Sequence, residues 1–569
     1  MKRKLSVFPI SLALIAFLAL VLLPATAHAQ LTRGSIVGTV HDESGAVVPG
    51  AAVTVTNPQT GQTREAVTND DGYYRVTALD PGNYVVAISK AGFGKVENRE
   101  VAVRSALDTT FDVDLKVGNI TGTVDVTAET EAISLNKTNG TIGLTVSPRQ
   151  VVELPISSGR DINQLALLSP NAFSAPGSTG ISVNGQRARN NNFTIDGSDN
   201  NDITVTLSTT PVPPEAVAEF QVQTNPYSVE YGRNSGAQIN VITKSGTNLF
   251  HGDLYEYYRG SRLNALDNVE KRNLQTRPSR FNRNQFGFTI GGPVLIPGFG
   301  EGGHKFAYDG RNRTFFFFAF QGDRLRSAGA LQTAVTIPTA TGFAALGSVN
   351  LRPGQSAASR AAVINQLSFL GGVYAQNPTF SRVFNNTAAN CVGGGTFVAA
   401  TQTTPARCNN GQFIELGVTT LGVNQPNNTS YYLARVDHKF GDNDNANIRY
   451  IGNKSIDTNV VSNLTFGERF AGAQNLFDQN LAISETHIFS QNIVNEVRAS
   501  YIRRNLDFPE NDTTTLTTTI SGLFAFGGAS NFPQSRVTDY YQLSDTMSWQ
   551  RGNHALKFGF DIRRNELYN

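Results

Sequence analysis

Alternation of apolar and polar residues dominates the chain from residue 249 onward. In the last alternating segment, Leu556, Phe558 and Ile562 share one face. Asp561 and Arg563 share the other face. A period of two predicts β-strands. Segments of about ten residues with one apolar and one charged face are typical of a membrane-spanning β-barrel, with lipid outside and a polar lumen inside. A soluble β-sandwich with one solvated face shows the same alternation and is the alternative.

Nine strands are predicted, near 249–260, 285–294, 313–325, 428–440, 445–456, 477–490, 493–505, 539–552 and 554–566. The links between them distinguish the two alternatives, because bacterial barrels alternate short periplasmic turns with long extracellular loops. Tight links occupy 441–444, 490–492 and 551–553. The link 295–312 is an exception, since it is moderately long but falls on the short-turn side. Long links rich in Asn, Gly and Thr occupy 326–427, 457–476 and 506–538.

The N-terminus predicts export. A basic start at Lys2–Lys4 precedes an apolar run at Leu5–Leu23 and a small-residue site at Ala27–Ala29. This pattern is typical of a secretory signal peptide over residues 1–29, cut between Ala29 and Gln30; an uncleaved anchor is the alternative. No later stretch reaches the roughly 18–20 apolar residues of a spanning helix. A membrane-embedded mature protein must therefore cross as a closed β-barrel.

Composition excludes several classes of function. The net charge is only +2 and there is no basic block, so nucleic-acid binding is not expected. Charged residues make up 16% of the chain, against about 25% in typical soluble proteins. The only two cysteines, Cys391 and Cys408, lie close together in a Gly-, Asn- and Thr-rich segment. In an oxidising compartment they predict a loop disulfide, and without nearby histidines they do not predict a zinc site.

Short strands separated by Gly, Pro and Asn turns fill residues 30–117 and predict a small β-sandwich. The segment reads GTVHDESGAVVPGAAVTV and then TNDDGYYRV…LDPGNYVV. These motifs, from Gly38 to about Val117, resemble the carboxypeptidase regulatory-like domain, a transthyretin-like sandwich with a carbohydrate-binding-like fold. No zinc-ligand motif accompanies the resemblance, so sugar binding is only a possibility at the level of the fold.

Residues 136–246 form a mixed segment. SPRQVVELPISSGRDINQLALLSPN holds two short helical patterns broken by Pro155, and a small helix is predicted around Glu215–Glu219. Together with VNGQRARNNNFTIDGSDNND and PEAVAEFQVQTNPYSVEYGRNSGAQINVITKSG, this segment resembles the plug of TonB-dependent outer-membrane receptors. The regulatory-like domain before the plug resembles the Oar-like subgroup. The plug motif residues are Asn184, Gly185, Asp196, Gly197, Tyr231, Gly232 and Asn240.

The predicted fold is mainly β: a transthyretin-like sandwich, a mixed α/β plug and the N-terminal part of a transmembrane antiparallel barrel over 247–569. Outer-membrane transporters close about 22 strands around a plugged lumen, so nine strands are expected to be an incomplete barrel. The chain is therefore expected to be a fragment of a longer protein or an incomplete gene product. Its N-terminal domain is expected in the periplasm and its barrel in outer-membrane lipid.

The resemblance also implies a TonB box, a short strand before the plug that pairs with an inner-membrane TonB-type energy transducer by β-augmentation. The linker 118–135 holds one short β-like run. A plain linker or a last strand of the sandwich is the alternative. The TonB-box candidate comprises Thr123, Val124, Asp125, Val126, Thr127 and Ala128.

The function implied is energy-coupled uptake of a large scarce ligand, such as a siderophore, an oligosaccharide or a peptide. The alternative is surface adhesion or protein export without small-ligand transport, because a link as long as 326–427 is usually functional or disordered. No enzyme and no cofactor are predicted, since the seven histidines show no metal-binding spacing.

Two local features have competing interpretations. The run DGSDNND at 196–202 resembles a calcium loop, but it lacks the glycine at the sixth position and has Leu207 where a bidentate Glu belongs, so a polar plug loop is predicted. The break at Ser245–Asn248 looks like a hairpin turn. Counting it as a hairpin would put the short turns on the extracellular side, so it is predicted to separate plug from barrel.

Overall fold

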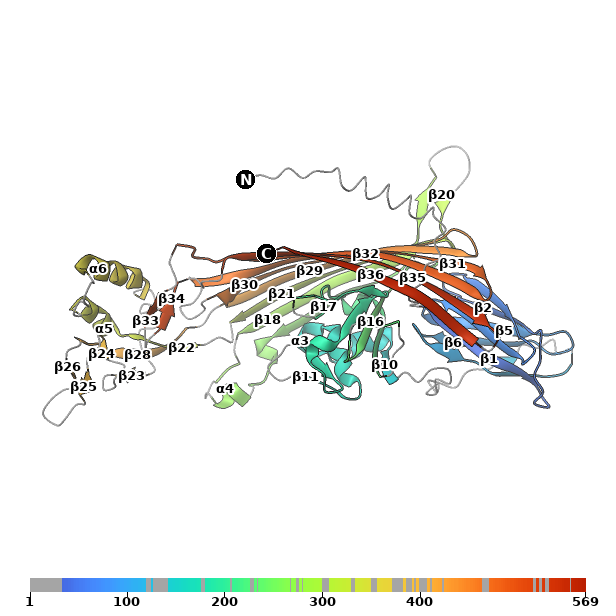
Figure 1. The fold of residues 1–569 in the computed structure, drawn as a ribbon, viewed down its shortest axis with the longest axis horizontal. Coiled ribbons are helices and arrows are strands. Elements are labelled where there is room, and N and C mark those ends of the chain that lie inside the picture. Colours follow the sequence, from blue (N-terminus) through green and yellow to red (C-terminus); the bar gives the residue numbers. More distant parts are fainter. Residues whose placement is uncertain are drawn as a thin grey trace.

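A computed structural model describes most of the chain (Figure 1). A long curved sheet carries a compact domain on its concave side, a sandwich at one end and a lobe at the other. The described residues are 33–118, 124–125, 142–174, 180–204, 207–225, 230–232, 234–266, 268–272, 276–278, 280–298, 306–328, 333–348, 356–370, 382–384, 391–392, 396–398, 407–409, 412–421, 424–462, 470–514, 518–520, 524–527, 532–552 and 554–568.

The N-terminal domain is a β-sandwich. One sheet joins β4, β1 and β7, with β8 also paired to β1, and the other has the order β3-β2-β5-β6-β9. Alternate residues of both sheets point into a shared apolar core that includes Ile36, Val53, Tyr84 and Leu115. The strands are β1 (Gly34–Asp42), β2 (Ala52–Thr56), β3 (Thr63–Val67), β4 (Tyr73–Leu79), β5 (Gly82–Ser89), β6 (Val96–Val103), β7 (Asp108–Thr110), β8 (Val113–Leu115) and β9 (Val124–Asp125).

The second domain, here called the plug, is built on a five-stranded sheet of order β10-β15-β16-β13-β14. Ser147 caps its first helix with a capping box to Gln150, and Pro148 begins the helix, so the local sequence sets this start. The strands are β10 (Ile142–Val146), β11 (Ala172–Ser174), β12 (Ile181–Val183), β13 (Asn192–Ile195), β14 (Ser198–Asp199), β15 (Val217–Asn225) and β16 (Gln238–Thr243). The helices are α2 (Pro148–Glu153), α3 (Ser157–Arg160) and the 3₁₀ turns η1 (Ile162–Leu168), η2 (Ala188–Asn190) and η3 (Pro214–Ala216).

One helix prediction in the plug is wrong. The structure has only a 3₁₀ turn, η3, where a helix was predicted around Glu215–Glu219, and Glu219 itself lies in strand β15. From Val217 the chain alternates buried core residues such as Phe220 with polar ones that pair across to β16. The gain from that pairing outweighs the weak local preference for a helix.

Nine described strands form one antiparallel sheet in sequential order, which confirms the predicted fold class. Each predicted strand has a counterpart, and most are longer than expected. They are β17 (His251–Gly260), β18 (Phe281–Pro293), β21 (Thr314–Ala328), β29 (Asn424–Lys439), β30 (Asp444–Ser462), β31 (Ala471–Ser490), β32 (Ile493–Phe508), β35 (Gln534–Arg551) and β36 (His554–Tyr568).

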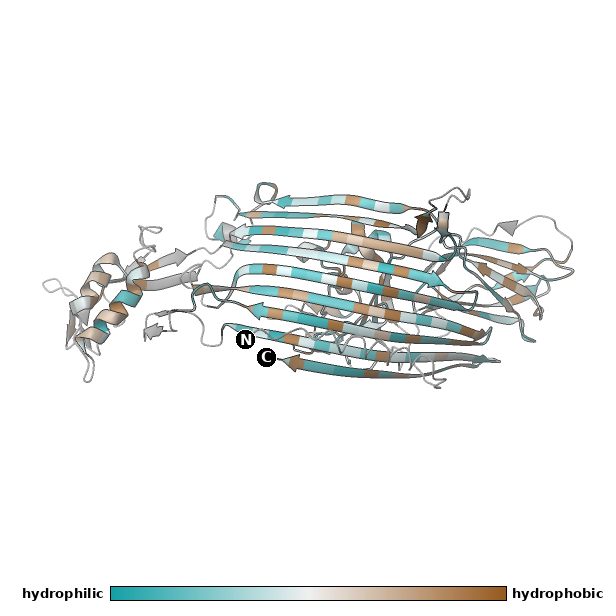
Figure 2. Ribbon diagram, turned by 90° about the horizontal axis from the view of Figure 1, so that it is seen from above, coloured by the Kyte–Doolittle hydropathy of each residue, from teal (hydrophilic) through white to brown (hydrophobic). Residues whose placement is uncertain are grey.

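The two faces of this sheet differ in chemistry, and brown and teal segments follow each other along its strands in Figure 2. Leu254, Ile448 and Ile562 are exposed on the convex face. Arg449 and Asp478 are almost fully buried on the concave face, where the plug lies. The convex face therefore has the apolar character of a lipid-facing wall, and the concave face that of a polar lumen.

Tight turns collect at the end of the sheet where the sandwich lies, here called the short-turn end. The link 295–312, which is the exception to the short links at this end, contains a small hairpin of β19 (Leu295–Pro297) and β20 (Phe306–Asp309). The opposite end, here called the long-loop end, carries η4 (Ser261–Leu263) and α4 (Asn268–Arg272) and a separate lobe. In bacterial barrels the short turns face the periplasm.

The lobe at the long-loop end is formed by two loops. Ile337, Leu370 and Leu416 are fully buried in it, and Thr339 hydrogen-bonds Glu415 through both backbone and side chain. Its elements are β22 (Thr333–Pro338), α5 (Ala340–Ala345), η5 (Leu346–Ser348), α6 (Ala357–Gln366), η6 (Leu367–Phe369), β23 (Arg382–Phe384), β24 (Cys391–Val392), β25 (Thr396–Val398), β26 (Arg407–Asn409), β27 (Gln412–Phe413), β28 (Leu416–Leu421), β33 (Thr518–Ile520) and β34 (Phe524–Phe526).

The segment after β16 does not make a hairpin with β17. Strand β16 pairs with β15 and β13 in the plug, whereas β17 pairs with β18 in the large sheet. At Gly246 an added Cβ would lie 2.3 Å from the carbonyl oxygen of Phe316, so the chain presses against the sheet there. Among the described residues, no helix is both long and apolar enough to cross a membrane.

Candidate functional site: the contact between plug and inner wall

The tip of the plug nearest the sheet wall is a two-residue turn between β13 and β14. Asp196 and Gly197 both have positive φ, 47° and 74°. Two consecutive positive φ values define the type I′ hairpin, which Asp-Gly favours because Gly has no Cβ and Asp tolerates this region. The turn projects the Asp196 carboxylate toward the wall.

Asp196 is held from both sides. The backbone N–H and the hydroxyl of Thr243 each donate to its carboxylate at 2.8 Å. From the wall, Arg449 Nη1 lies 2.6 Å from Asp196 Oδ2, and Arg435 Nη1 lies 3.5 Å from Oδ1. The Arg449 side chain is only 1% exposed, so this is a buried ion pair between plug and barrel strand β30.

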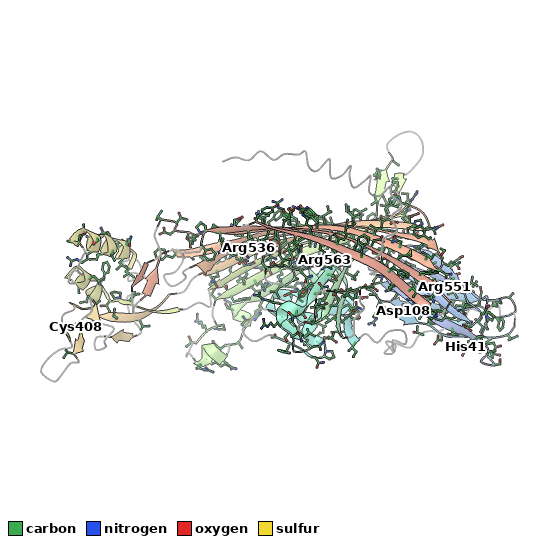
Figure 3. The ribbon with its side chains drawn as sticks, in the orientation of Figure 1. His41, Asp108, Cys408, Arg536, Arg551 and Arg563 are labelled. Atoms are coloured by element: carbon green, nitrogen blue, oxygen red, sulfur yellow. The ribbon has the colours of Figure 1, made fainter. Side chains whose placement is uncertain are left out.

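The next acidic residues of the same loop also contact wall arginines. Arg563 Nη1 on β36 lies 2.6 Å from Asp199 Oδ2, and Arg563 is labelled in Figure 3. Arg504 Nη1 on β32 lies 3.3 Å from Asp202 Oδ2. The predicted polar plug loop therefore contacts strands across the sheet, and its carboxylates are engaged by guanidinium groups.

Apolar packing surrounds these ion pairs. Phe317, Leu433 and Ile451, from three different barrel strands, are buried in the same cluster as the plug core. Phe220 and Val241 are among the plug side chains of that cluster. The plug and the inner wall therefore share one apolar core, and the ion pairs set the orientation of the plug on the wall.

The balance of forces on Asp196 favours its charged form. Burial acts to raise the pKa of Asp196, but the charges of Arg449 and Arg435 and the hydrogen bonds from Thr243 outweigh burial and lower this pKa overall. The carboxylate therefore stays ionised at neutral pH. Buried ion pairs of this kind specify geometry more than they add net stability, and they are costly to break by removing one partner.

Two of the predicted plug residues meet behind the turn. Asn240 on β16 accepts hydrogen bonds from Thr194 Oγ1 at 2.5 Å and from Gln238 Nε2 at 2.6 Å, and its own amide donates to Gln221. The same amide lies 3.5 Å from the hydroxyl of Tyr231. This buried ladder of amides crosses the polar face of the plug sheet.

The other motif residues lie elsewhere in the plug. Asn184 and Gly185 form a second positive-φ turn, at 54° and 72°, and the Asn184 amide donates to the carbonyl of Thr224 at 2.6 Å. Gly232 follows Tyr231, where an added Cβ would meet no atom within 4 Å. The roles of all seven residues remain predictions.

The sandwich contacts both plug and wall at the short-turn end. Arg64 Nη1 donates to the carbonyl of Asp442 at 2.8 Å, in the turn between β29 and β30. The backbone N–H of Asn248 donates to the carbonyl of Gln59 at 2.9 Å. A polar cavity of about 130 Å³ remains where the three parts meet, lined by charged residues that include Arg33.

A buried carboxylate marks the contact between sandwich and plug. The backbone N–H of Ser105 donates to Glu219 on β15 at 3.1 Å. Burial raises the pKa of Glu219 to about 7, although this hydrogen bond and the charge of Arg104 act in the opposite direction. The two groups that the sandwich contributes, the Ser105 N–H and the Arg104 charge, therefore favour the ionised form of Glu219, whereas burial favours the protonated form.

Burial of this carboxylate predicts a pH dependence of stability. In the unfolded chain Glu219 has its ordinary pKa of 4.5, so its contribution to the stability of the fold is complete below that value and is lost as pH rises through about 7. The shift corresponds to roughly 3 kcal/mol at about 1.4 kcal/mol per unit. Hydrogen exchange at the Ser105 amide, corrected for its intrinsic rate, is expected to accelerate between pH 5 and pH 8. Glu219→Gln should abolish that change; an equal pH response in the variant would contradict the assignment.

The predicted TonB box is described only in part. Val124 and Asp125 form β9, which pairs in parallel with β6 on the edge of the sandwich, Val124 opposite Val96. This is the position that the alternative, a last strand of the sandwich, requires. Thr123, Val126, Thr127 and Ala128 lie outside the described residues, as do Ala29 and Gln30 of the cleavage site.

Cys408 is disulfide-bonded and lies in the lobe at the far end from the sandwich, as labelled in Figure 3. Because the side chain of Cys391 lies outside the described residues, the pairing of these two cysteines stays a prediction.

Comparison with known families gives this architecture a context. The model of the outer membrane beta barrel domain matches residues 242–569, more than half of the chain. The chain belongs to the outer-membrane β-barrel family. The carboxypeptidase regulatory-like domain matches residues 35–116. This protein of the bacterial outer membrane thus combines a barrel domain with the regulatory-like domain that its N-terminal motifs resemble, and the predicted localisation is confirmed.

Three individual proteins are similar to this chain. The TonB-dependent transporter Oar of Myxococcus xanthus is 27% identical over 272 residues, which cover 46% of this chain and 25% of that protein. The siderophore receptor PirA of Acinetobacter baumannii has 11% identity and a TM-score of 0.45, with 75% of this chain and 48% of that chain covered. The transporter YddB of Escherichia coli has 12% identity and a TM-score of 0.43, with 74% and 47% covered.

This outer-membrane barrel therefore spans about half the length of those solved structures. The resemblance to TonB-dependent receptors of the Oar-like subgroup is confirmed at the level of the family. The named relatives are transporters and receptors rather than enzymes.

Sequence reasoning missed most of the wall arginines of the site. Arg563 was recognised only as a member of a polar strand face, and Arg449 and Arg504 were not singled out. The available signal was the coincidence of inward-facing arginines with an Asp-rich plug loop in one chain. That signal indicates that the charges of wall and loop are complementary, but it does not say which arginine pairs with which aspartate. The period of a β-strand alone does not place distant strands around a plug.

Proposed function

We propose that this chain is the receptor portion of a TonB-dependent outer-membrane transporter, which takes up a large scarce ligand by energy coupling. The observation that carries the proposal is the plug docked on the inner wall by ion pairs at Asp196, Asp199 and Asp202. Such a plug closes the lumen at rest and has discrete contacts that a pulling force can break. The partners proposed are an inner-membrane TonB-type transducer and an extracellular ligand.

The geometry supports a direction for the force. Strand β10 (Ile142–Val146) is the first strand of the plug and lies at the edge of its sheet, paired only with β15 among the described strands. The TonB-box candidate precedes β10 by fewer than twenty residues in the chain. Force applied there reaches β10 before any other plug strand. Siderophores are named for solved neighbours, and oligosaccharides and peptides suit this chain equally well.

Proline substitutions test the coupling step. Val124→Pro with Val126→Pro should lower the affinity for the purified periplasmic domain of the TonB-type transducer by more than about tenfold, because proline cannot donate to a strand ladder. The matched control, Thr130→Pro with Ala132→Pro, introduces two prolines with the same spacing elsewhere in the same linker. Binding is measured by titration with the unsubstituted protein in detergent as reference. Equal binding by both double variants would reject Val124–Val126 as the docking strand.

A second candidate function is surface adhesion or export. It is favoured by the lobe, since Ile337, Leu370 and Leu416 give that loop region a core of its own at the long-loop end. An adhesin would keep its surface binding in the Val124/Val126 proline variant. A transporter would lose uptake.

A further inference from the structure

Three metal-ligating side chains meet at the short-turn end of the sheet, outside the site described above. Asp444 is the first residue of β30, and Glu485 and His487 lie near the end of β31. One ligand atom from each residue lies within 4.8 Å of the other two. Asp444 is directly opposite His487 in the strand register, and Glu485 is two residues away on the same face.

These side chains point away from the plug. On β31, Asp478 and Asn480 face the plug and are fully buried. Because strand faces alternate, Glu485 and His487 lie on the opposite face, together with the exposed Phe489. The trio therefore lies on the convex face near its rim, where charged groups on a barrel cost about 0–1 kcal/mol rather than the larger penalty of mid-membrane.

The charges of the trio are only partly compensated. His487 Nδ1 lies 2.5 Å from Asp444 Oδ1. Among the residues that the structure describes, no lysine or arginine forms an ion pair with Asp444 or Glu485. Two carboxylates this close favour a shared cation, and an imidazole nitrogen beside them favours a transition metal over calcium or magnesium, which prefer oxygen ligands.

A neighbouring histidine provides an internal comparison. His438 lies at the end of β29 and Phe440 just after it, and His487 and Phe489 lie at the end of β31; the ring centroids are 4.4 Å and 4.3 Å apart respectively. His438, however, is hydrogen-bonded to Thr314 at 2.7 Å. The two histidines thus share their position at the rim, but only His487 belongs to a cluster with two carboxylates.

We propose that Asp444, Glu485 and His487 form a binding site for a divalent transition-metal cation of the zinc type at the periplasmic rim. The cation takes the place of the proton shared between His487 and Asp444, with water completing its coordination. Zinc bonds of about 2.0–2.2 Å put ligand atoms roughly 3.4 Å apart, so half-exposed side chains need only small rotations.

The site would also stabilise the docking surface of the sandwich. The carbonyl of Asn443 accepts a hydrogen bond from the N–H of Ile488 at 2.9 Å, so the turn before Asp444 is already joined to β31. The neighbouring Asp442 carbonyl accepts from Arg64 of the sandwich. A cation bound at the trio therefore fastens the same turn that holds the N-terminal domain.

The test is zinc and cobalt titration of the untagged, detergent-purified protein, followed by calorimetry and by the visible absorption of Co²⁺. One equivalent is expected to bind, and His487→Ala and Glu485→Gln should each weaken binding at least tenfold. His438→Ala is the matched control and should bind as the unsubstituted protein does. Folding of each variant is checked by circular dichroism, and Glu485→Gln preserves volume if His487→Ala perturbs the rim.

Other outcomes would overturn the proposal. Absence of saturable binding to the unsubstituted protein would show that the pair His487–Asp444 is an ordinary ion pair. Equal loss of binding in His438→Ala and His487→Ala would show nonspecific binding to rim histidines. Unchanged binding in folded Glu485→Gln would remove the second carboxylate from the site.

Discussion

An Asp196→Ala protein is expected to lose about 3–5 kcal/mol of the free energy that holds the plug on the wall, because a buried charge loses its partner. Among the described residues, Arg449, 1% exposed, would keep only its hydrogen bond to Asn480. The backbone N–H of Thr243 would lose its acceptor as well. The plug should become sensitive to protease at lower temperature, as measured by limited proteolysis along a thermal ramp in detergent.

Two further variants separate the causes. Asp196→Asn keeps the positive-φ turn and an acceptor for Thr243 but removes the charge, so it isolates the ion pair. Asp196→Ala combined with Arg449→Met removes both charges and should recover part of the loss. The control is Asp70→Ala, at an exposed position of the sandwich. If Asp196→Ala were as stable as this control, the ion pair would have no role in docking.

In a Gly246→Val protein the junction between plug and barrel should not pack correctly. The expected loss of stability is about 3 kcal/mol, the upper end of the range for overpacked substitutions. An added Cβ at this position would lie 2.3 Å from the carbonyl oxygen of Phe316 and 2.7 Å from that of Gly292. Both neighbours are barrel backbone atoms, which cannot rotate away. Thermal unfolding measured by circular dichroism would show the lower midpoint.

The control for Gly246 is Gly441→Val, in the tight turn between β29 and β30. There an added Cβ meets nothing within 4 Å, and the backbone does not need a positive φ. This variant should unfold within about 0.5 kcal/mol of the unsubstituted protein, as surface substitutions usually do. Similar losses for both variants would mean that the effect comes from the residue type and not from the junction.

The strands of the large sheet were predictable because a period of two is a local property. Leu556 and Ile562 reveal their shared face without any knowledge of partners. Strand ends were less predictable: β31 begins at Ala471, six residues before the predicted start near 477. The first residues of β31, such as Gln474 and Asn475, are polar because this part of the strand extends toward the long-loop end. There the strand lies beyond the lipid, so its outer face does not need to be apolar.

The site itself was predictable only on the plug side. Asp196-Gly197 has a local signature, because few residue pairs adopt two positive φ values. Arg449 and Arg563 have none, since their partners lie 253 and 364 residues away in the chain. Glu219 was misplaced for the same reason: its strand is set by β16 and its burial by Ser105 of another domain.

Those same separations predict an order of folding. Contacts within the plug join residues at most tens of positions apart, such as Asn192 and Gln238, and each barrel strand pairs with its neighbour in sequence. The ion pair of Asp199 with Arg563 closes a loop of 364 residues. The entropy cost of closing so long a loop is overcome only after the intervening strands have formed. Occupation of the lumen is therefore expected to be a late step, although the plug is synthesised first. Until the plug docks, the wall arginines Arg435 and Arg563 can pair with Asp437 and Asp561 of their own strands.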